Sequence, residues 1–277
     1  MKKTISIFLI ILLLYGFKIY ADSYSFEGIT YISHIEDTYL FDNGIFHHYE
    51  HFIDENDKDV IVNFTAKYKI MNKNAYTIAE ILDESDIYSI YIFSADNKHM
   101  ILYDCKEHNT IFLTARTSRI DESWIWPIND STATSCLSEK LKSGSYVTYD
   151  IKNLENQNIT ECWVEGKDGY GINEKISFNI NGSRNLYVIN GFFSPDNPQL
   201  FEYNSRVKTV QINCYDSKGC FLDSFFHEFK DMGNMQLIKF DKRYKKIEFV
   251  IKDVYPGLKY TDTAISGLFI DGLDIYN

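Results

Sequence analysis

Short apolar runs of strand length dominate this chain, and no segment has the pattern of a long amphipathic helix. In residues 22–126, the runs 60–64 and 88–93 are rich in Val, Ile, Tyr and Phe, which pack well on a pleated surface. Turn-forming residues at 42–44 (Asp-Asn-Gly) and 95–98 (Ala-Asp-Asn-Lys) separate such runs and favour antiparallel hairpins. This first part is therefore predicted to form a compact β-meander or a small barrel.

Two features of the first part allow other interpretations. Apolar residues of 76–84 recur at helical spacing, so a helical turn is an alternative there. His47 and His51 are of a type that binds metals, but on a strand they lie about 13 Å apart on one face, at a rise of roughly 3.3 Å per residue. That separation is too large to chelate one ion without other ligands. A solvated hairpin arm is the better interpretation, and no metal site is predicted.

The second part has the same β pattern with more glycine. Residues 186–193 are almost continuously apolar, as in a central strand that is buried on both faces. Ile247, Phe249 and Ile251 alternate with polar residues and so share one face of a strand. These patterns predict an all-β chain whose second part is a two-sheet jelly-roll sandwich.

A change in composition at residue 127 predicts a domain boundary. All four prolines lie at or beyond this position, and residues 127–135 are small, polar and begin with proline, as in a linker. We therefore expect two separable β domains, residues 22–126 and residues 127–277.

The first 21 residues have the order of a secretory signal peptide. Lys2 and Lys3 precede the apolar run 5–17, and the small residue Ala21 ends the segment. A membrane-spanning helix needs roughly 20 apolar residues, so an uncleaved anchor is the less favoured alternative. The sequence predicts an exported protein, periplasmic or secreted, with no stable membrane span after signal removal.

The charge balance argues against nucleic acid as a partner. The chain has 28 Lys and Arg against 39 Asp and Glu, a net charge of −11. Removal of the predicted signal peptide takes away three Lys and no acidic residue, which leaves −14. Binding a phosphate backbone needs clustered Lys and Arg, so a glycan or a cell-surface partner is the better expectation.

Five cysteines in an exported chain permit disulfides, but the odd number leaves at least one thiol unpaired. Cys214 and Cys220 flank a turn-like segment and could pair across a hairpin. They could equally be small buried hydrophobic residues.

A series of short motifs follows in a fixed order through the second part. Trp163-Val164-Glu165-Gly166 leads through a glycine-rich stretch to Glu174, and further blocks come later in the chain. These blocks are Asn190-Gly191, Asn204-Ser205-Arg206-Val207-Lys208, Asp231 with Gln236, and Asp253-Val254-Tyr255-Pro256-Gly257 onward to Ser266. The ordered set resembles the factor V/VIII type C (discoidin-like) domain of NAD glycohydrolases. The resemblance implies a galactose-binding-like sandwich with a role in glycan binding and toxin translocation rather than in NAD cleavage.

Side chains suited to sugar recognition lie within these blocks, because sugars are bound by aromatic faces and by planar polar groups. The expected ligand-binding residues are Trp163, Glu165, Asn190, Arg206, Tyr255 and Asp262. Structural roles are the alternatives. Trp163 could anchor the core, Arg206 could form an internal ion pair with Glu165 or Asp262, and Asn190 could shape a turn.

Relatives of the discoidin type often carry a calcium ion held by an Asp-Gly turn and by a Glu near the final strand. Here Asn156-Gln157 stands at the turn, and Gly267 follows Ser266 where the family often has Glu. Calcium prefers charged oxygen ligands. We therefore expect no tight calcium site and no other cofactor.

These observations favour an exported, non-catalytic binding protein that recognises carbohydrate or a surface partner. One alternative is an NAD glycohydrolase or a glycoside-cleaving enzyme with catalysis in residues 22–126, where Glu80 and Glu84 could in principle act as acid and base. A second alternative is a structural or adhesive envelope protein.

Overall fold

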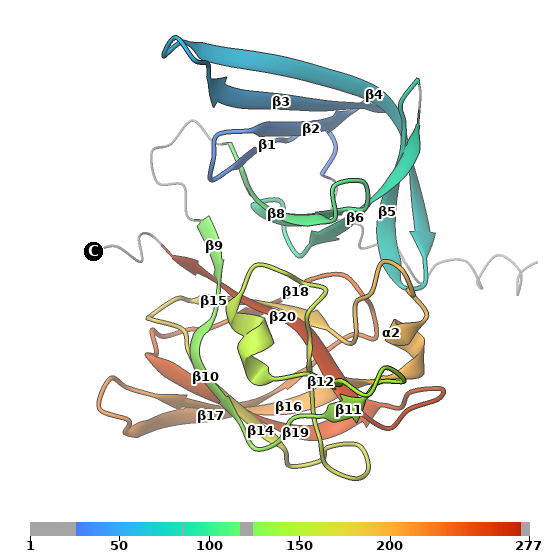
Figure 1. The fold of residues 1–277 in the computed structure, drawn as a ribbon. Coiled ribbons are helices and arrows are strands. Elements are labelled where there is room, and N and C mark those ends of the chain that lie inside the picture. Colours follow the sequence, from blue (N-terminus) through green and yellow to red (C-terminus); the bar gives the residue numbers. More distant parts are fainter. Residues whose placement is uncertain (1–25, 85, 117–123, 273–277) are drawn as a thin grey trace, which may run out of the picture.

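The computed structural model describes residues 26–84, 86–116 and 124–272, and its regular structure is almost entirely β (Figure 1). The predicted signal peptide lies outside the described residues. Within them, no helix combines the length and the apolar character that crossing a membrane requires. The first eight strands are β1 (Thr30–Ser33), β2 (Thr38–Asp42), β3 (Ile45–Ile53), β4 (Asp59–Lys73), β5 (Tyr76–Leu82), β6 (Ile87–Ser94), β7 (His99–Asp104) and β8 (Asn109–Ala115).

The remaining elements form the lower half of Figure 1. The longer strands are β14 (Lys175–Asn179), β15 (Asn185–Asn190), β16 (Ser205–Tyr215), β17 (Phe221–Glu228), β18 (Gln236–Lys239), β19 (Lys246–Tyr255) and β20 (Thr263–Gly272). The shorter elements are β9 (Trp124–Pro127), β10 (Asn129–Ala133), β11 (Ser138–Lys140), β12 (Tyr146–Thr148), β13 (Trp163–Val164), the 3₁₀ helix η1 (Ile151–Glu155) and the helix α2 (Leu200–Tyr203).

Strands β1 to β8 form a closed barrel, as expected for the first part. Each strand pairs with the next, and β1 pairs with β8 to close the ring. The turn predicted at 42–44 joins β2 to β3, and it has positive φ at Asn43 (48°) and Gly44 (77°), as a two-residue hairpin turn requires. Residues 76–82 are the strand β5, so the helical alternative for this segment is wrong. Rings and aliphatic side chains fill the interior of the barrel.

The second part is a sandwich of two layers around one apolar core. One layer has the order β10-β14-β19-β16-β17, and the other contains β18, β15 and β20, with β9 and β13 also paired to β20. The layers join where β16 pairs in parallel with β20 over Ser205 and Arg206. The expectations for 186–193 and for Ile247, Phe249 and Ile251 are confirmed, because β15 is a buried central strand and β19 turns these three side chains into the core.

The linker predicted at residues 127–135 is wrong. This segment contributes β10 and the end of β9 to the sandwich, and Ile128 and Ser131 are almost completely buried. Its polar sequence has a physical reason. β10 is an edge strand that pairs only with β14, so Asp130 and Thr132 point into solvent.

The barrel and the sandwich share a third apolar core. Phe193 of the sandwich packs edge-on against Tyr76, Tyr91, Phe93 and Tyr103 of the barrel, with ring centroids 5.0–5.5 Å apart. Further contacts join the two parts through Tyr187, whose hydroxyl donates to Asp96, and through the rings of Phe112 and Phe269. Separability of the two domains stays a prediction, and this core bears directly on it.

The cysteines are all unpaired. Cys214 lies in β16 opposite Asp223 of β17 and is buried in the sandwich core, whereas Cys220 is exposed in the preceding turn. The two thiols therefore do not face each other across the hairpin, and the disulfide alternative is wrong. Cys214 acts as a small hydrophobic residue.

Candidate functional site

The residues predicted to bind ligand gather at one end of the sandwich, which we call the loop end. Asn190 ends β15 and Tyr255 ends β19, while Arg206 lies at the start of β16 and Asp262 directly precedes β20. Strand β13 brings Trp163 beside Ile265 of β20. The sequence blocks that are far apart along the chain are thus neighbours in space.

Trp163 is completely buried in the sandwich core, and its indole N–H donates to the carbonyl of Ser135 at 3.0 Å. A buried indole needs such a partner, and the ring has no face left for a ligand. The geometry corresponds to the core-anchor alternative for this residue.

Glu165 is also completely buried, which is unusual for a carboxylate. Its Oε2 accepts from the backbone N–H of Lys167 at 2.7 Å, and its Oε1 has no hydrogen-bond partner in the described structure. Burial raises the pKa of this carboxyl, and the nearby Asp262 and Glu174 carboxylates raise it further. The loop after Glu165 wraps tightly around it. A Cβ at Gly171, where φ is +65°, would lie 2.6 Å from the Glu165 Cγ.

Asn190 joins the two layers of the sandwich. Its Nδ2 donates to the Val207 carbonyl at 2.7 Å, and its Oδ1 accepts from the Val207 N–H at 3.1 Å. The amide therefore replaces a strand partner for β16 at the point where the backbone ladder ends. The Asn190 side chain that makes these two hydrogen bonds is buried.

Arg206 is a clamp that holds three loops together. Its guanidinium forms a paired interaction with Asp231, from Nε to Oδ1 at 2.9 Å and from Nη2 to Oδ2 at 2.7 Å. Nη1 donates to the carbonyl of Asn204 at 2.8 Å and reaches that of Pro256 at 3.4 Å. The ring of Phe201 lies 5.1 Å from the guanidinium carbon. The internal ion pair considered from the sequence is present, but its acid is Asp231 rather than Glu165 or Asp262.

Tyr255 and Asp262 are the two predicted residues that retain partial exposure. The Tyr255 hydroxyl donates to the Phe229 carbonyl at 2.8 Å. The backbone carbonyl of Asp262 accepts from Ser205 N–H at 2.9 Å, and its carboxylate makes no hydrogen bond or ion pair with the described residues. Asp262 is thus the partly exposed residue of the predicted set whose side chain has no hydrogen-bond partner among the described residues.

Sequence reasoning missed a group of tyrosines near Asp262, of which Tyr170 and Tyr260 are exposed and Tyr203 is half-buried. Lys259 lies 4.8 Å from the ring centre of Tyr260 and 5.6 Å from that of Tyr203. Tyr170 joins the group because its carbonyl accepts from the hydroxyl of Thr263, the residue after Asp262. Tyr170 is 40% exposed and Tyr260 37% exposed, which is high for large rings. We call Tyr170, Tyr203, Lys259, Tyr260 and Asp262 the tyrosine surface.

The signal that could have found this surface is weak. Tyr260 falls within a block that resembles the family, but the chain has 21 tyrosines, and buried and exposed tyrosines are alike in sequence. Only the fold separates Tyr187, which is fully buried, from Tyr260.

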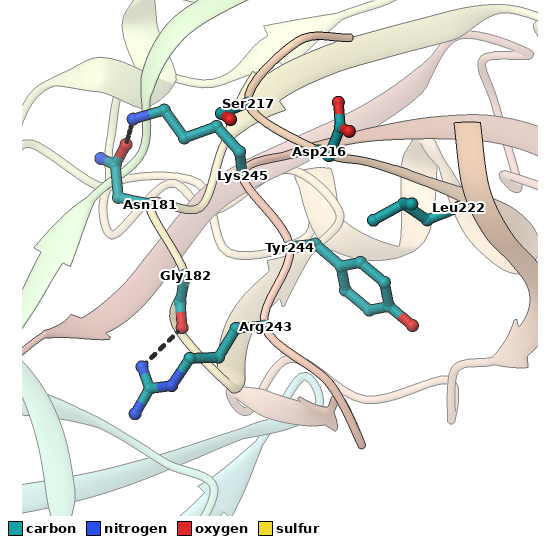
Figure 2. Close-up of a pocket in the computed structure, with 8 residues that line it drawn as sticks. All are labelled: Asn181, Gly182, Asp216, Ser217, Leu222, Arg243, Tyr244 and Lys245. Atoms are coloured by element: carbon teal, nitrogen blue, oxygen red, sulfur yellow. Dashed lines mark hydrogen bonds between the residues drawn. The ribbon is translucent and has the colours of Figure 1, made fainter. Parts of the chain in front are cut away.

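A hollow of about 300 Å³ lies at the opposite end of the sandwich (Figure 2). Its cationic side chains are already paired, since Arg243 donates to the Gly182 carbonyl at 2.8 Å and Lys245 to the Asn181 Oδ1 at 2.6 Å. Leu222 provides an exposed apolar wall.

The residues at the discoidin-type calcium position do not suit this ion. Asn156 donates to Glu161 Oε2 at 2.8 Å and accepts from the Asn158 N–H. Both ends of its neutral amide are therefore hydrogen-bonded within this turn. Glu161 is the one carboxylate of this hydrogen-bonded group. At Gly267 the ring of Phe269 occupies the space of a side chain, 2.4 Å from where a Cβ would stand. A cation of this kind needs several charged oxygen ligands.

Comparison with known proteins gives one match in sequence and several in structure. No curated protein matches the chain. The family 32 CBM from C. perfringens NanJ, solved in complex with galactose, is similar at 12% identity over 51% of this chain and 92% of that one, with a TM-score of 0.37. The C-terminal domain of a chitobiase from Bacteroides fragilis is similar at 20% identity over 52% of this chain and 95% of that one, with a TM-score of 0.36.

The match in sequence covers the sandwich. Residues 127–271, just over half of the 277, match the family described as the NAD glycohydrolase translocation F5/8 type C domain. The ordered blocks, the two-layer sandwich and this match agree, and the chain belongs to that family.

Proposed function

We propose that this protein is an exported, non-catalytic binding protein whose sandwich recognises carbohydrate through the tyrosine surface. The observation that carries the proposal is a set of accessible tyrosines at the loop end, the exposed Tyr170 and Tyr260 and the half-buried Tyr203, with Lys259 and Asp262 beside the last two. Aromatic faces pack against the C–H surface of a sugar, while charged groups hydrogen-bond its hydroxyls.

The buried residues of the predicted set support this surface from behind. Arg206 ties the loop that carries Pro256 to the loop that carries Asn204. The N–H groups of Lys259 and Tyr260 both donate to the Tyr203 carbonyl, so the tyrosines are fixed by the backbone around the clamp. A rigid scaffold reduces the entropy lost on binding. We therefore assign Trp163, Glu165, Asn190 and Arg206 as positioning residues and Asp262 as a ligand contact, with Tyr255 at the edge.

A glycan array with residues 22–277 tests the proposal, followed by titration of the best sugar against two variants. Tyr260→Ala should weaken binding by roughly 1–3 kcal/mol while leaving the melting temperature almost unchanged. Leu222→Ala, at the hollow of Figure 2, is the matched control and should bind normally. Loss of binding in Leu222→Ala alone would move the site to the opposite end of the sandwich.

The same preparation separates the alternatives. Hydrolysis of NAD or of a glycoside would favour an enzyme in the barrel, with Glu80 and Glu84 as the residues to substitute first. Binding to a purified envelope protein, with no sugar bound on the array, would favour the adhesive alternative.

Export is supported by the sequence order of residues 1–21, and it needs its own measurement. We expect the mature protein, isolated from the producing cells, to begin at Asp22. Recovery of the chain with residue 1 intact in a membrane fraction would contradict export as a cleaved protein.

A further inference from the structure

The hairpin of β3 and β4 extends beyond the rest of the barrel, on the side remote from the sandwich (Figure 1). Strand β2 accompanies β3 only as far as Tyr49, and β5 accompanies β4 only from Lys67 onward. Residues 50–53 of β3 and 59–62 of β4 therefore form a two-stranded arm with one edge on each strand, and the unpaired edge of β4 continues through residues 63–66.

The two edges of this arm differ. On the β3 side, the N–H of His51 donates to Oδ1 of Asp37 at 3.0 Å, and this carboxylate is almost fully buried. The edge is thus capped by a side chain. On the β4 side, no strand among the described residues pairs with 59–66.

The direction of the His51 N–H also shows which backbone groups of β4 point to the open edge. Because His51 directs its N–H away from β4, the pair His51 and Ile61 is one of the non-hydrogen-bonded pairs of the ladder. In an antiparallel ladder such pairs alternate. The N–H and C=O groups of Asp59, Ile61, Asn63 and Thr65 therefore point to the open edge.

The open edge has none of the usual protection against pairing. Residues 60–66 contain no charge, no proline and no glycine, and no bulge interrupts their pairing with β3. Large apolar side chains of the arm are exposed, among them Ile61 (56%) and Val62 (46%). An exposed apolar edge without such protection is a template on which another strand can pair.

The distribution of charge along β4 indicates which strand pairs with its open edge. The acidic residues Asp57 and Asp59 lie at one end of the open edge, and the exposed Lys67 and Lys69 lie at the other. Neither lysine takes part in an ion pair among the described residues. An antiparallel second copy of β4, related by a two-fold axis at Val62, would pair Ile61 with Asn63 and Asp59 with Thr65. Each acidic end would then lie beside the basic end of the partner copy.

We propose that the open edge of β4, residues 59–66, pairs with the same edge of a second copy of this chain and forms a symmetric dimer. The pairing joins two arms into one four-stranded sheet and leaves the loop end of each sandwich free, because the arm lies on the far side of the barrel (Figure 1). A dimer of this form presents two tyrosine surfaces, which strengthens attachment to a surface with many glycans.

Sedimentation velocity of residues 22–277 over a range of concentrations tests the dimer. Reversing the charges at either end of the open edge tests the dimer without depending on which residues of the two β4 strands pair. One variant carries Asp57→Lys and Asp59→Lys, and the other carries Lys67→Asp and Lys69→Asp. Each should dimerise at least about tenfold more weakly than the original chain, because like charges then meet. An equimolar mixture of the two should dimerise at least as well as the original chain.

A proline pair tests the edge itself. Ile61→Pro removes an N–H that points to the open edge, and so it should abolish the dimer while the ladder with β3 persists. Ile53→Pro makes the same change on the β3 side of the arm and should leave the dimer intact. Circular dichroism checks that both variants are folded. A monomer at about 100 µM in the original chain, or equal behaviour of the two proline variants, would overturn the proposal.

Discussion

The barrel and the sandwich reach a β fold in opposite ways. Every strand of the barrel pairs with its neighbours in sequence, apart from the closing pair β1 and β8. The sandwich pairs strands that are far apart, such as β14 with β19 and β15 with β20. The barrel has a largely apolar interior, whereas the loop end of the sandwich buries Glu165, Asn190 and Arg206.

This difference explains why the polar sequence motifs lie in the sandwich. Local hairpins are specified by their own turns, but loops from distant strands need polar side chains to hold them in one arrangement. The residues that mark the family in sequence are thus largely the framework of the loop end. The exposed groups that surround them are the ones we propose as ligand contacts.

The largest loss of stability is expected from a substitution in the apolar core that the barrel and the sandwich share. Phe193→Ala removes a ring that touches four aromatic side chains of the barrel, and it should lower the free energy of unfolding by about 4 kcal/mol. Urea unfolding should change from one transition to two, because the barrel and the sandwich then lose their coupling. Phe226→Ala, at a 67% exposed ring, is the control and should have little effect. A single transition of unchanged midpoint in Phe193→Ala would show that this ring does not couple the two parts.

The clamp at the loop end should give the next largest effect. Arg206→Ala leaves Asp231 and the Asn204 carbonyl without their donor, which should cost about 3 kcal/mol in urea unfolding. Lys208→Ala lies two residues further along β16 and breaks a surface ion pair with Asp253 and a contact of 6.0 Å with the Tyr255 ring, so it should cost less than about 1 kcal/mol. Equal stability of the two variants would remove Arg206 from the framework.

Acid should weaken the contact between the two parts through His99. This residue is buried on the barrel against Tyr187 of the sandwich, and burial lowers the pKa of its imidazole to about 4. Since the ordinary pKa is higher, the unfolded state binds the extra proton first, and stability present above pH 6.5 is lost as the pH falls toward 4. We expect a loss of about 2 kcal/mol between pH 7 and pH 5.

Comparison with His99→Gln isolates this contribution from other groups that titrate in the same range. The difference in unfolding free energy between the original chain and the variant should shrink on acidification. A constant difference from pH 7 to pH 5 would mean that His99 takes up its proton without cost in the folded state.

The smallest expected change in stability is that of Glu165→Gln. Burial raises the pKa of this carboxyl, so the folded state holds its proton more tightly than the unfolded state, and the contribution to stability is lost as the pH rises. Glu165→Gln cannot ionise, so it should gain stability relative to the original chain between pH 5 and pH 8, on the order of 1 kcal/mol. Thermal melts at both pH values measure this. A variant that loses stability at pH 8 would indicate that the ionised carboxylate has a partner.

Local features of the fold could be predicted from sequence because their causes are local. The hairpin at 42–44 follows from residues that tolerate positive φ, and the strand β19 follows from the alternation of Ile247, Phe249 and Ile251. The linker at 127–135 failed because the polar residues of an edge strand have the composition of a loop.

The sequence by itself determined that this protein is all-β and that its second part is a discoidin-like sandwich. Only the tertiary structure decided that Arg206 pairs with Asp231, that Tyr260 is exposed while Tyr187 is buried, and that β4 has an open edge. The reason is physical. Strand patterns and turns depend on neighbouring residues, whereas burial, ion-pair partners and free edges depend on which distant segments come to lie side by side.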